Sequence, residues 1–116
     1  MTEAFEACPG ELMRVLYVFV MNQFFESLGQ DYVDAARRRG VVIAKPALDS
    51  RVALELLELA RTAAHTQERR FAPLTSYLAG VAAERLRAAK PDLDDTAVAE
   101  FILEIRQQLE REIPGL

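Results

Sequence analysis

Apolar side chains recur every three or four residues along most of the chain, which is the spacing of an α-helix and not the alternation of a strand. The clearest case is the last third, where we predict a helix with Asp94 as its N-cap and an end at Pro114-Gly115. One face of this helix is predicted to lie in the core and consists of Val98, Phe101, Ile102, Ile105 and Leu109.

A second amphipathic helix is predicted after the N-cap sequence Leu48-Asp49-Ser50. Its apolar stripe contains Val52, Leu56, Leu59 and Ala63. Its polar face is expected to lie in water and consists of Arg51, Glu55, Glu58, Thr62, His65 and Arg69.

Two prolines delimit a third helix, which is predicted from Pro73 to Ala89 and is ended by Pro91. Its middle, LAGVAAERL, is rich in small residues that would let another helix approach closely. Gly80 in the interior of a helix costs up to about 1 kcal/mol relative to alanine. We therefore expect a packing partner at Gly80.

The first helix is predicted from Pro9 to about Leu28, and its sequence LMRVLYVFVMNQFFESL (residues 12–28) is apolar on nearly every side. Gly29 leaves two alternatives, one bent helix that continues or two separate helices. In both, the helical spacing ends at Gly40, the expected C′ residue. The following VVIAKP is either an extended connector or a very short strand.

These elements predict an all-α protein, a single domain over residues 1–116 built as a small bundle of four principal helices. Two amphipathic helices and a small-residue helix can cover only part of a helix that is apolar all round. Either the first helix is central and wrapped by the other three, or its uncovered side is a subunit interface. We favour the interface, with the bundle completed by oligomerisation, as a homodimer or with another protein partner. The predicted interface residues are Leu12, Val15, Leu16, Phe19, Val20, Phe24 and Phe25.

Net charge and composition limit which partners and which cellular compartment we expect for the chain. A net charge of -4 over 116 residues gives no general attraction to nucleic acid or to an acidic membrane. The single cysteine, Cys8, excludes an internal disulfide and a multi-thiolate metal site, which suits the cytoplasm. The acidic start MTEAFEACPG is unlike a secretory signal, and Arg14 and Asn22 interrupt the apolar stretch, so we expect no membrane span.

Candidate chemistry is sparse. His65 is the only histidine, which excludes a metal site with several imidazoles from one chain, and a lone histidine on a polar helix face is more typical of a solvated residue than of a catalytic base. Glycine-rich phosphate loops, serine nucleophile elbows and zinc-ligand spacings do not occur in the sequence. The sequence predicts no catalytic residue, metal or cofactor. It favours a protein that is not an enzyme and leaves open the alternative of an enzyme that uses a pocket near His65.

Nucleic-acid binding is one alternative. The sequence FFESLGQDYVDAARRRG (residues 24–40) could form a helix, a turn at Gly29 and a second helix that carries Arg37, Arg38 and Arg39, as in a helix-turn-helix. The same arginines would also stabilise the C-terminal end of a helix, and the chain as a whole is acidic.

The sequence ALELLELARTAAHTQERRFAPLTSYLAGVAA resembles a small actinobacterial helical domain of unknown function. The features that carry the resemblance lie at about residues 52–84: a leucine-rich helix that ends at Ala64-His65, a short connector, and Ala72-Pro73-Leu74-Thr75 at the start of a helix containing Gly80. That family is typically encoded beside, or fused to, molybdenum cofactor guanylyltransferase.

The functional hypothesis from the residues is a non-enzymatic assembly protein that associates through its apolar first helix. The resemblance implies an alternative, an accessory protein of molybdenum cofactor maturation that binds a small molecule or nucleotide. The positions that the resemblance implies are His65, Pro73, Leu74 and Thr75. The candidate binding pocket for this alternative is near His65, Arg69, Arg70 and Thr75.

Overall fold

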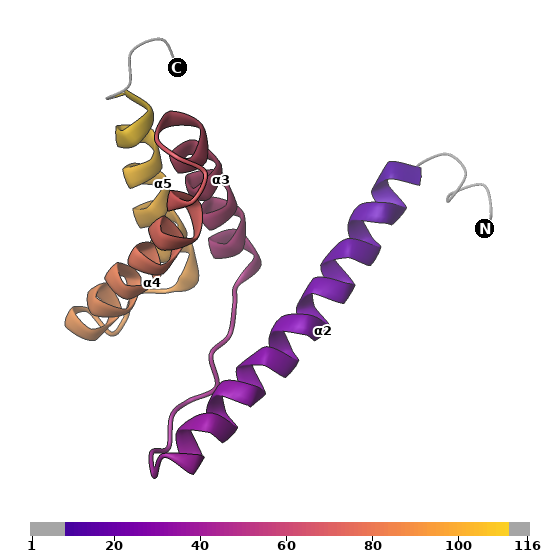
Figure 1. The fold of residues 1–116 in the computed structure, drawn as a ribbon, viewed down its shortest axis with the longest axis vertical. Helices are drawn as coiled ribbons and strands as arrows, with labels where there is room; N and C mark the ends of the chain where they lie inside the picture. The colour runs from indigo at the N-terminus through magenta and orange to yellow at the C-terminus, as the bar shows by residue number, and fades with distance from the viewer. Residues whose placement is uncertain (1–8, 112–116) are drawn as a thin grey trace. The chain divides into compact units, whose positions relative to one another are not determined.

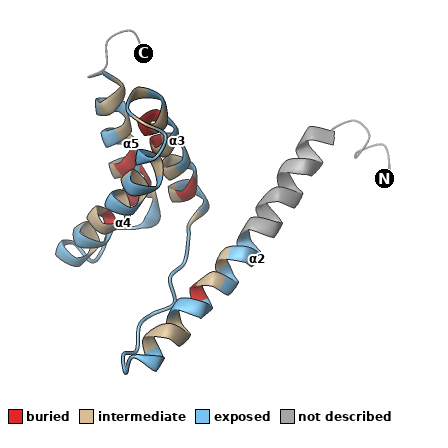
Figure 2. Ribbon diagram, viewed as in Figure 1, coloured by how far each residue is buried: buried red, intermediate tan, exposed pale blue. Residues whose placement is uncertain are grey.

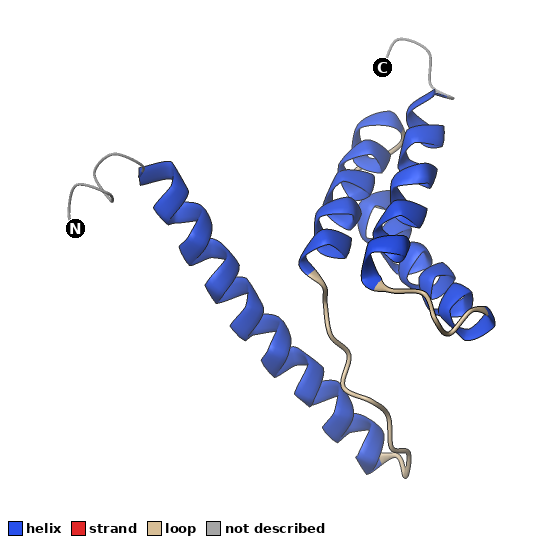
Figure 3. Cartoon of the chain, turned by 180° about the vertical axis from the view of Figure 1, so that it is seen from behind, coloured by secondary structure: helices blue, strands red, loops and turns tan. Residues whose placement is uncertain are grey.

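The computed structural model describes residues 9–111, and the side chains of residues 22–111. This part of the chain forms four α-helices and no strand (Figures 1 and 3). They are α2 (Pro9–Arg38), α3 (Ser50–Thr66), α4 (Phe71–Ala89) and α5 (Asp95–Arg111). The predicted all-α class with four principal helices is confirmed. The contacts divide the chain into two units, one that ends at Leu48 and one that begins at Asp49.

The second unit is a three-helix bundle in which α4 and α5 each pack along α3 and touch each other less. Its core is small and consists of Leu59, Ala83, Val98 and Ile102, with Val52, Leu56, Ala79 and Leu109 packed around them. Figure 2 shows the buried positions of this unit in red on α3, α4 and α5. The stripes predicted for α3 and α5 therefore supply most of the core.

Both predicted N-caps are present. The Asp49 carboxylate accepts hydrogen bonds from the backbone N–H groups of Arg51 and Val52, at 2.9 and 3.1 Å. The Asp94 carboxylate accepts one from the N–H of Ala97, at 2.9 Å. Each cap satisfies N–H groups that have no partner inside the helix.

Helix α4 begins at Phe71 and not at Pro73, which corrects the predicted start by two residues. Pro73 lies in the first turn of the helix, where its missing N–H costs nothing. The backbone N–H of Phe71 donates to the carbonyl of Glu68 at 2.9 Å, so a tight turn leads directly into the helix.

The polar face of α3 does not lie wholly in water, which corrects the sequence expectation. Thr62 is only 6% exposed, and its hydroxyl donates to the carbonyl of Glu58 at 3.0 Å and to the carboxylate of Glu110 at 3.3 Å. The guanidinium of Arg106 on α5 lies 3.4 Å from the carboxylate of Glu55 and 3.1 Å from that of Glu110. A polar network therefore joins α3 to α5 beside the apolar core.

Burial has the largest single effect on the pKa of Arg106 and lowers it, because burial penalises the charged form. The hydrogen bonds and charges of Glu110 and Glu55 together outweigh this effect, and the pKa of Arg106 is raised above its ordinary value. The guanidinium is therefore charged throughout the accessible pH range.

In the first unit, α2 runs through Gly29 as one helix, so the alternative of two helices is wrong. The helix ends at Arg38, and Gly40, with a φ of 80°, is the C′ residue as predicted. The N–H of Gly40 donates to the carbonyl of Arg37 and that of Val41 to the carbonyl of Ala36, both at 2.9 Å. These two bonds are the Schellman motif that a C′ glycine permits.

The segment VVIAKP is an extended connector, not a strand, and it lies against α2. A Cβ atom on Gly29 would be 2.6 Å from the carbonyl oxygen of Pro46 and 3.1 Å from the Cγ of Lys45. The ammonium of Lys45 also lies 2.6 Å from the carboxylate of Glu26. Gly29 is thus required for the close approach of the connector and does not end the helix.

Candidate functional site

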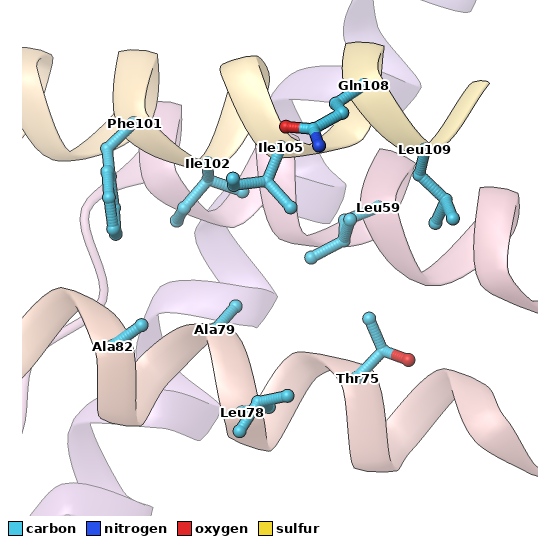
Figure 4. Close-up of a pocket in the computed structure, with 10 residues that line it drawn as sticks. All are labelled: Leu59, Thr75, Leu78, Ala79, Ala82, Phe101, Ile102, Ile105, Gln108 and Leu109. Atoms are coloured by element: carbon cyan, nitrogen blue, oxygen red, sulfur yellow. The ribbon is translucent and has the colours of Figure 1, made fainter. Parts of the chain in front are cut away.

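An apolar groove with a volume of about 390 Å³ lies between α4 and α5 (Figure 4). Residue Leu59 of α3 contributes to it, and the side chains from α4 and α5 point into it from opposite sides. Its lining contains no charged residue and only two polar ones, Thr75 and Gln108. The complete lining is Leu59, Thr75, Leu78, Ala79, Ala82, Phe101, Ile102, Ile105, Gln108 and Leu109.

The groove is open because of the side chains that α4 turns toward α5. These are mainly small, Thr75, Ala79 and Ala82, so they do not fill the space that Phe101 and Ile105 leave on the other side. Protein interiors are normally packed with few such voids. An unfilled apolar groove is therefore a candidate binding surface.

Three large apolar side chains of α4 lie in water: Leu78, which lines the groove, and Leu74 and Tyr77, which do not. Leu74, Tyr77 and Leu78 are 65%, 74% and 69% exposed. No charged residue occurs on α4 from Phe71 to Ala83, so this surface carries none of the charges that usually face solvent. The groove and these side chains together are called the α4 surface below.

The sequence predicted that small residues on α4 leave space for another helix, but the packing partner was expected at Gly80. A Cβ atom on Gly80 would have nothing within 4 Å, so no close packing explains this glycine within the described residues. The signal for the α4 surface was the run without charge from Phe71 to Ala83, which has more apolar faces than α3 and α5 can cover.

The predicted small-molecule site is not gathered into one pocket. Thr75 lines the groove and is half-buried, whereas His65, Arg69 and Arg70 are exposed and are not among the lining residues. Arg70 forms an ion pair with Glu68. Among the described residues, no three His, Cys, Asp or Glu side chains are placed to hold a metal ion.

Most of the predicted interface lies outside the described side chains. This applies to Leu12, Val15, Leu16, Phe19 and Val20. Phe24 is exposed and Phe25 is half-buried, and their rings pack edge to face with centroids 5.0 Å apart. Neighbouring aromatic rings in water are consistent with an interface, which stays a prediction.

The helix-turn-helix interpretation required a turn at Gly29, and α2 forms no turn there. Two of the three arginines at the end of α2 make local contacts. Arg37 lies 3.6 Å from the carboxylate of Asp34, and the guanidinium of Arg39 donates to the carbonyl of Ala35 at 3.0 Å. These contacts stabilise the end of a helix, as the alternative explanation of the arginines expected.

No helix in the described part of the chain combines the length and the apolar character that crossing a membrane requires.

A family model described as Domain of unknown function (DUF6457) matches residues 24–113. The match extends well beyond residues 52–84, on which the resemblance rested, and it shows no link to molybdenum cofactor guanylyltransferase. It includes the α4 surface and begins at Phe24, so residues 12–23 of the apolar helix lie outside it. The chain matches no curated protein and no solved structure.

Proposed function

Since the chain belongs to the DUF6457 family of domains of unknown function, we propose its function from its own surfaces: it is a non-enzymatic assembly domain that joins protein chains. The observation that carries this proposal is the α4 surface, an open groove beside three exposed large side chains, with no charge from Phe71 to Ala83. The apolar first helix is the second surface that such an assembly would bury.

The exposed apolar side chains of α4 carry a cost in free energy. Each large apolar side chain that stays in water forgoes roughly 1.5–3 kcal/mol. Leaving Leu74, Tyr77 and Leu78 together in water would forgo an amount comparable to the whole stability of a small domain. An open apolar groove with large exposed apolar side chains on the same helix supports a protein interface.

The alternative is the accessory role in molybdenum cofactor maturation. A nucleotide needs donors for its phosphates, usually backbone N–H groups at a helix N-terminus or arginine side chains. No arginine, lysine or histidine lines the groove, and His65, Arg69 and Arg70 are exposed outside it. The alternative requires that guanine nucleotides raise the melting temperature and that Arg69→Ala abolishes this shift.

Light scattering coupled to size-exclusion chromatography tests the assembly function. We expect the full chain to be a dimer at micromolar concentration and Leu78→Glu to be a monomer, because the substitution places a charge in the interface. Leu54→Glu is the matched control, since Leu54 on α3 is 57% exposed but does not line the groove. A monomeric wild-type chain would refute the function, and so would a dimer that Leu78→Glu leaves intact.

A further inference from the structure

The apolar part of α2 is long enough to cover the groove. The groove lining runs from Thr75 to Ala82 on α4 and from Phe101 to Leu109 on α5, about 11–12 Å along each helix at a rise of about 1.5 Å per residue. The apolar segment of residues 12–28 lies within α2 and is about 26 Å long. One helix of this length would therefore cover the whole groove and extend past its ends.

The two surfaces also match in polarity. No charged residue lines the groove, and the segment 12–28 contains only Arg14 and Glu26, one near each end. Glu26 already has a partner in Lys45 at 2.6 Å. Docking this helix in the groove would bury apolar surface on both sides and leave no charge unpaired in the middle.

The connector determines which chain can supply this helix. It is held on α2 as far as Pro46, and α3 is capped by Asp49, so only Ala47 and Leu48 lie between these fixed points. This stretch spans about 10 Å at full extension, about the diameter of one helix. The groove opens between α4 and α5, on a floor that α3 provides, so a helix from the same chain would need a connector that passes α4 or α5.

We propose that the groove between α4 and α5 receives residues 12–28 of α2 from a second copy of this chain, in a reciprocal exchange. The proposal rests on the assembly function and specifies its contact. Each copy gives one helix and receives one, so the same contact forms twice and the dimer closes with two-fold symmetry.

Photo-cross-linking of the full chain tests the proposal. Leu78 is replaced by the photoreactive amino acid p-benzoylphenylalanine, and this light chain is mixed with an excess of ¹⁵N-labelled wild-type chain, unfolded and refolded together. Trypsin would cut after Arg70 and Arg85 and release residues 71–85 with the probe. We expect this light peptide to be joined to the heavy peptide of residues 15–37, which contains most of the apolar segment.

Two further probe positions keep the test informative. Ile105 lies on the α5 side of the groove and should give the same heavy peptide, even if the probe at Leu78 disturbs the fold. Leu54 is exposed outside the groove, and a probe there should give at least tenfold less of this product.

The mass of the cross-linked peptide shows which chain and which segment fill the groove. A link to the light peptide of residues 15–37 alone, despite the excess of heavy chain, means that each chain fills its own groove. A link to heavy residues 71–85 means that two α4 surfaces meet. A link to heavy residues 71–85 in a dimer overturns the exchange and leaves the assembly function in place. A groove that is filled by its own chain removes both, because the α4 surface is then not an interface, and a monomeric chain also removes both.

Discussion

At the scale of single residues, Gly80 and Gly29 are both inside helices and have opposite surroundings. Gly80 is exposed, and a Cβ atom there would meet nothing within 4 Å. We expect Gly80→Ala to raise the free energy of unfolding by about 0.5–1 kcal/mol, because alanine restricts the unfolded chain and favours helix. Urea unfolding followed by circular dichroism measures this change. A loss of stability would mean that something packs on Gly80.

Gly29→Ala should not bring the same gain, because its Cβ atom would lie 2.6 Å from the carbonyl oxygen of Pro46. The backbone of Pro46 cannot move aside as the end of a flexible side chain can, so we expect the connector to detach from α2. The NMR chemical shifts of residues 44–47 should then move toward random-coil values while α2 stays helical. Gly80→Ala is the control and should leave these shifts unchanged. Unchanged shifts in Gly29→Ala would show that the connector does not lie against Gly29.

Arg106 is a charged residue of α5 that pairs with Glu55 of α3. The side chain of Arg106 is 19% exposed and that of Glu55 is 18% exposed. Arg106→Ala leaves two carboxylates without their partner, and we expect it to lower the free energy of unfolding by about 1–3 kcal/mol, between a surface pair and a buried one. Arg61→Ala is the matched control, since Arg61 pairs with Glu58 at 3.3 Å on the exposed side of α3. It should cost less than about 1 kcal/mol. Equal losses from the two substitutions would refute a special role for the network.

The pH dependence of the Arg106→Ala effect follows from the sign of the pKa change. The pKa of Arg106 is raised in the folded chain, so its stabilising contribution is complete at every pH below the ordinary pKa of a guanidinium and is lost only above it. The loss of stability in Arg106→Ala should therefore be the same at about pH 6 and about pH 9. A large difference between these two values would contradict the assignment.

At the scale of elements, local sequence signals predicted the helix ends and missed what depends on other helices. Asp49, Asp94 and Gly40 act through their own neighbours in the chain, and each is where the sequence predicted it. Thr62 was assigned to water because polar residues usually face it, but its partner Glu110 lies on α5, far along the chain. The sequence did not predict the α4 surface for a related reason. Neighbouring helices determine which side of a helix is covered, and the sequence of that helix alone does not encode this.

The N-cap of α3 gives a prediction at this scale. Asp49 accepts two backbone hydrogen bonds, and α3 carries both other helices of its unit. We expect Asp49→Ala to lower the free energy of unfolding by about 0.5–2 kcal/mol, and Asp49→Ser, which keeps an acceptor, to restore most of the loss. Differential scanning calorimetry measures both. If serine is no better than alanine, the cap contributes little.

At the scale of the whole molecule, the two units differ in what they can bury alone. The second unit has its own core, Leu59, Ala83, Val98 and Ile102, but leaves the α4 surface in water. Over its described residues, 9–48, the first unit contains one long helix and a connector, which offer no second helix against which to bury apolar side chains. The proposed assembly would bury the α4 surface of one unit against the apolar helix of the other type of unit.

Removal of residues 1–23, which lie outside the family match, tests this complementarity. The shortened chain keeps the core of the second unit and loses most of the apolar segment, so we expect it to be a folded monomer with an open groove. An apolar dye such as anilinonaphthalene sulfonate should bind it more strongly than it binds the full chain. In the proposed dimer of the full chain, burial of apolar surface would drive the association, so we expect the dimer to persist when salt screens charges.

The dye should bind through the α4 surface if that surface is what the missing helix covers. Leu78→Glu in the shortened chain should then abolish most of the added fluorescence, whereas Leu54→Glu should not, although both leucines are exposed. A shortened chain that stays dimeric would show that residues 1–23 do not form the interface. A monomer without added dye binding would show that they cover a surface other than this groove, because exposed apolar grooves bind such dyes.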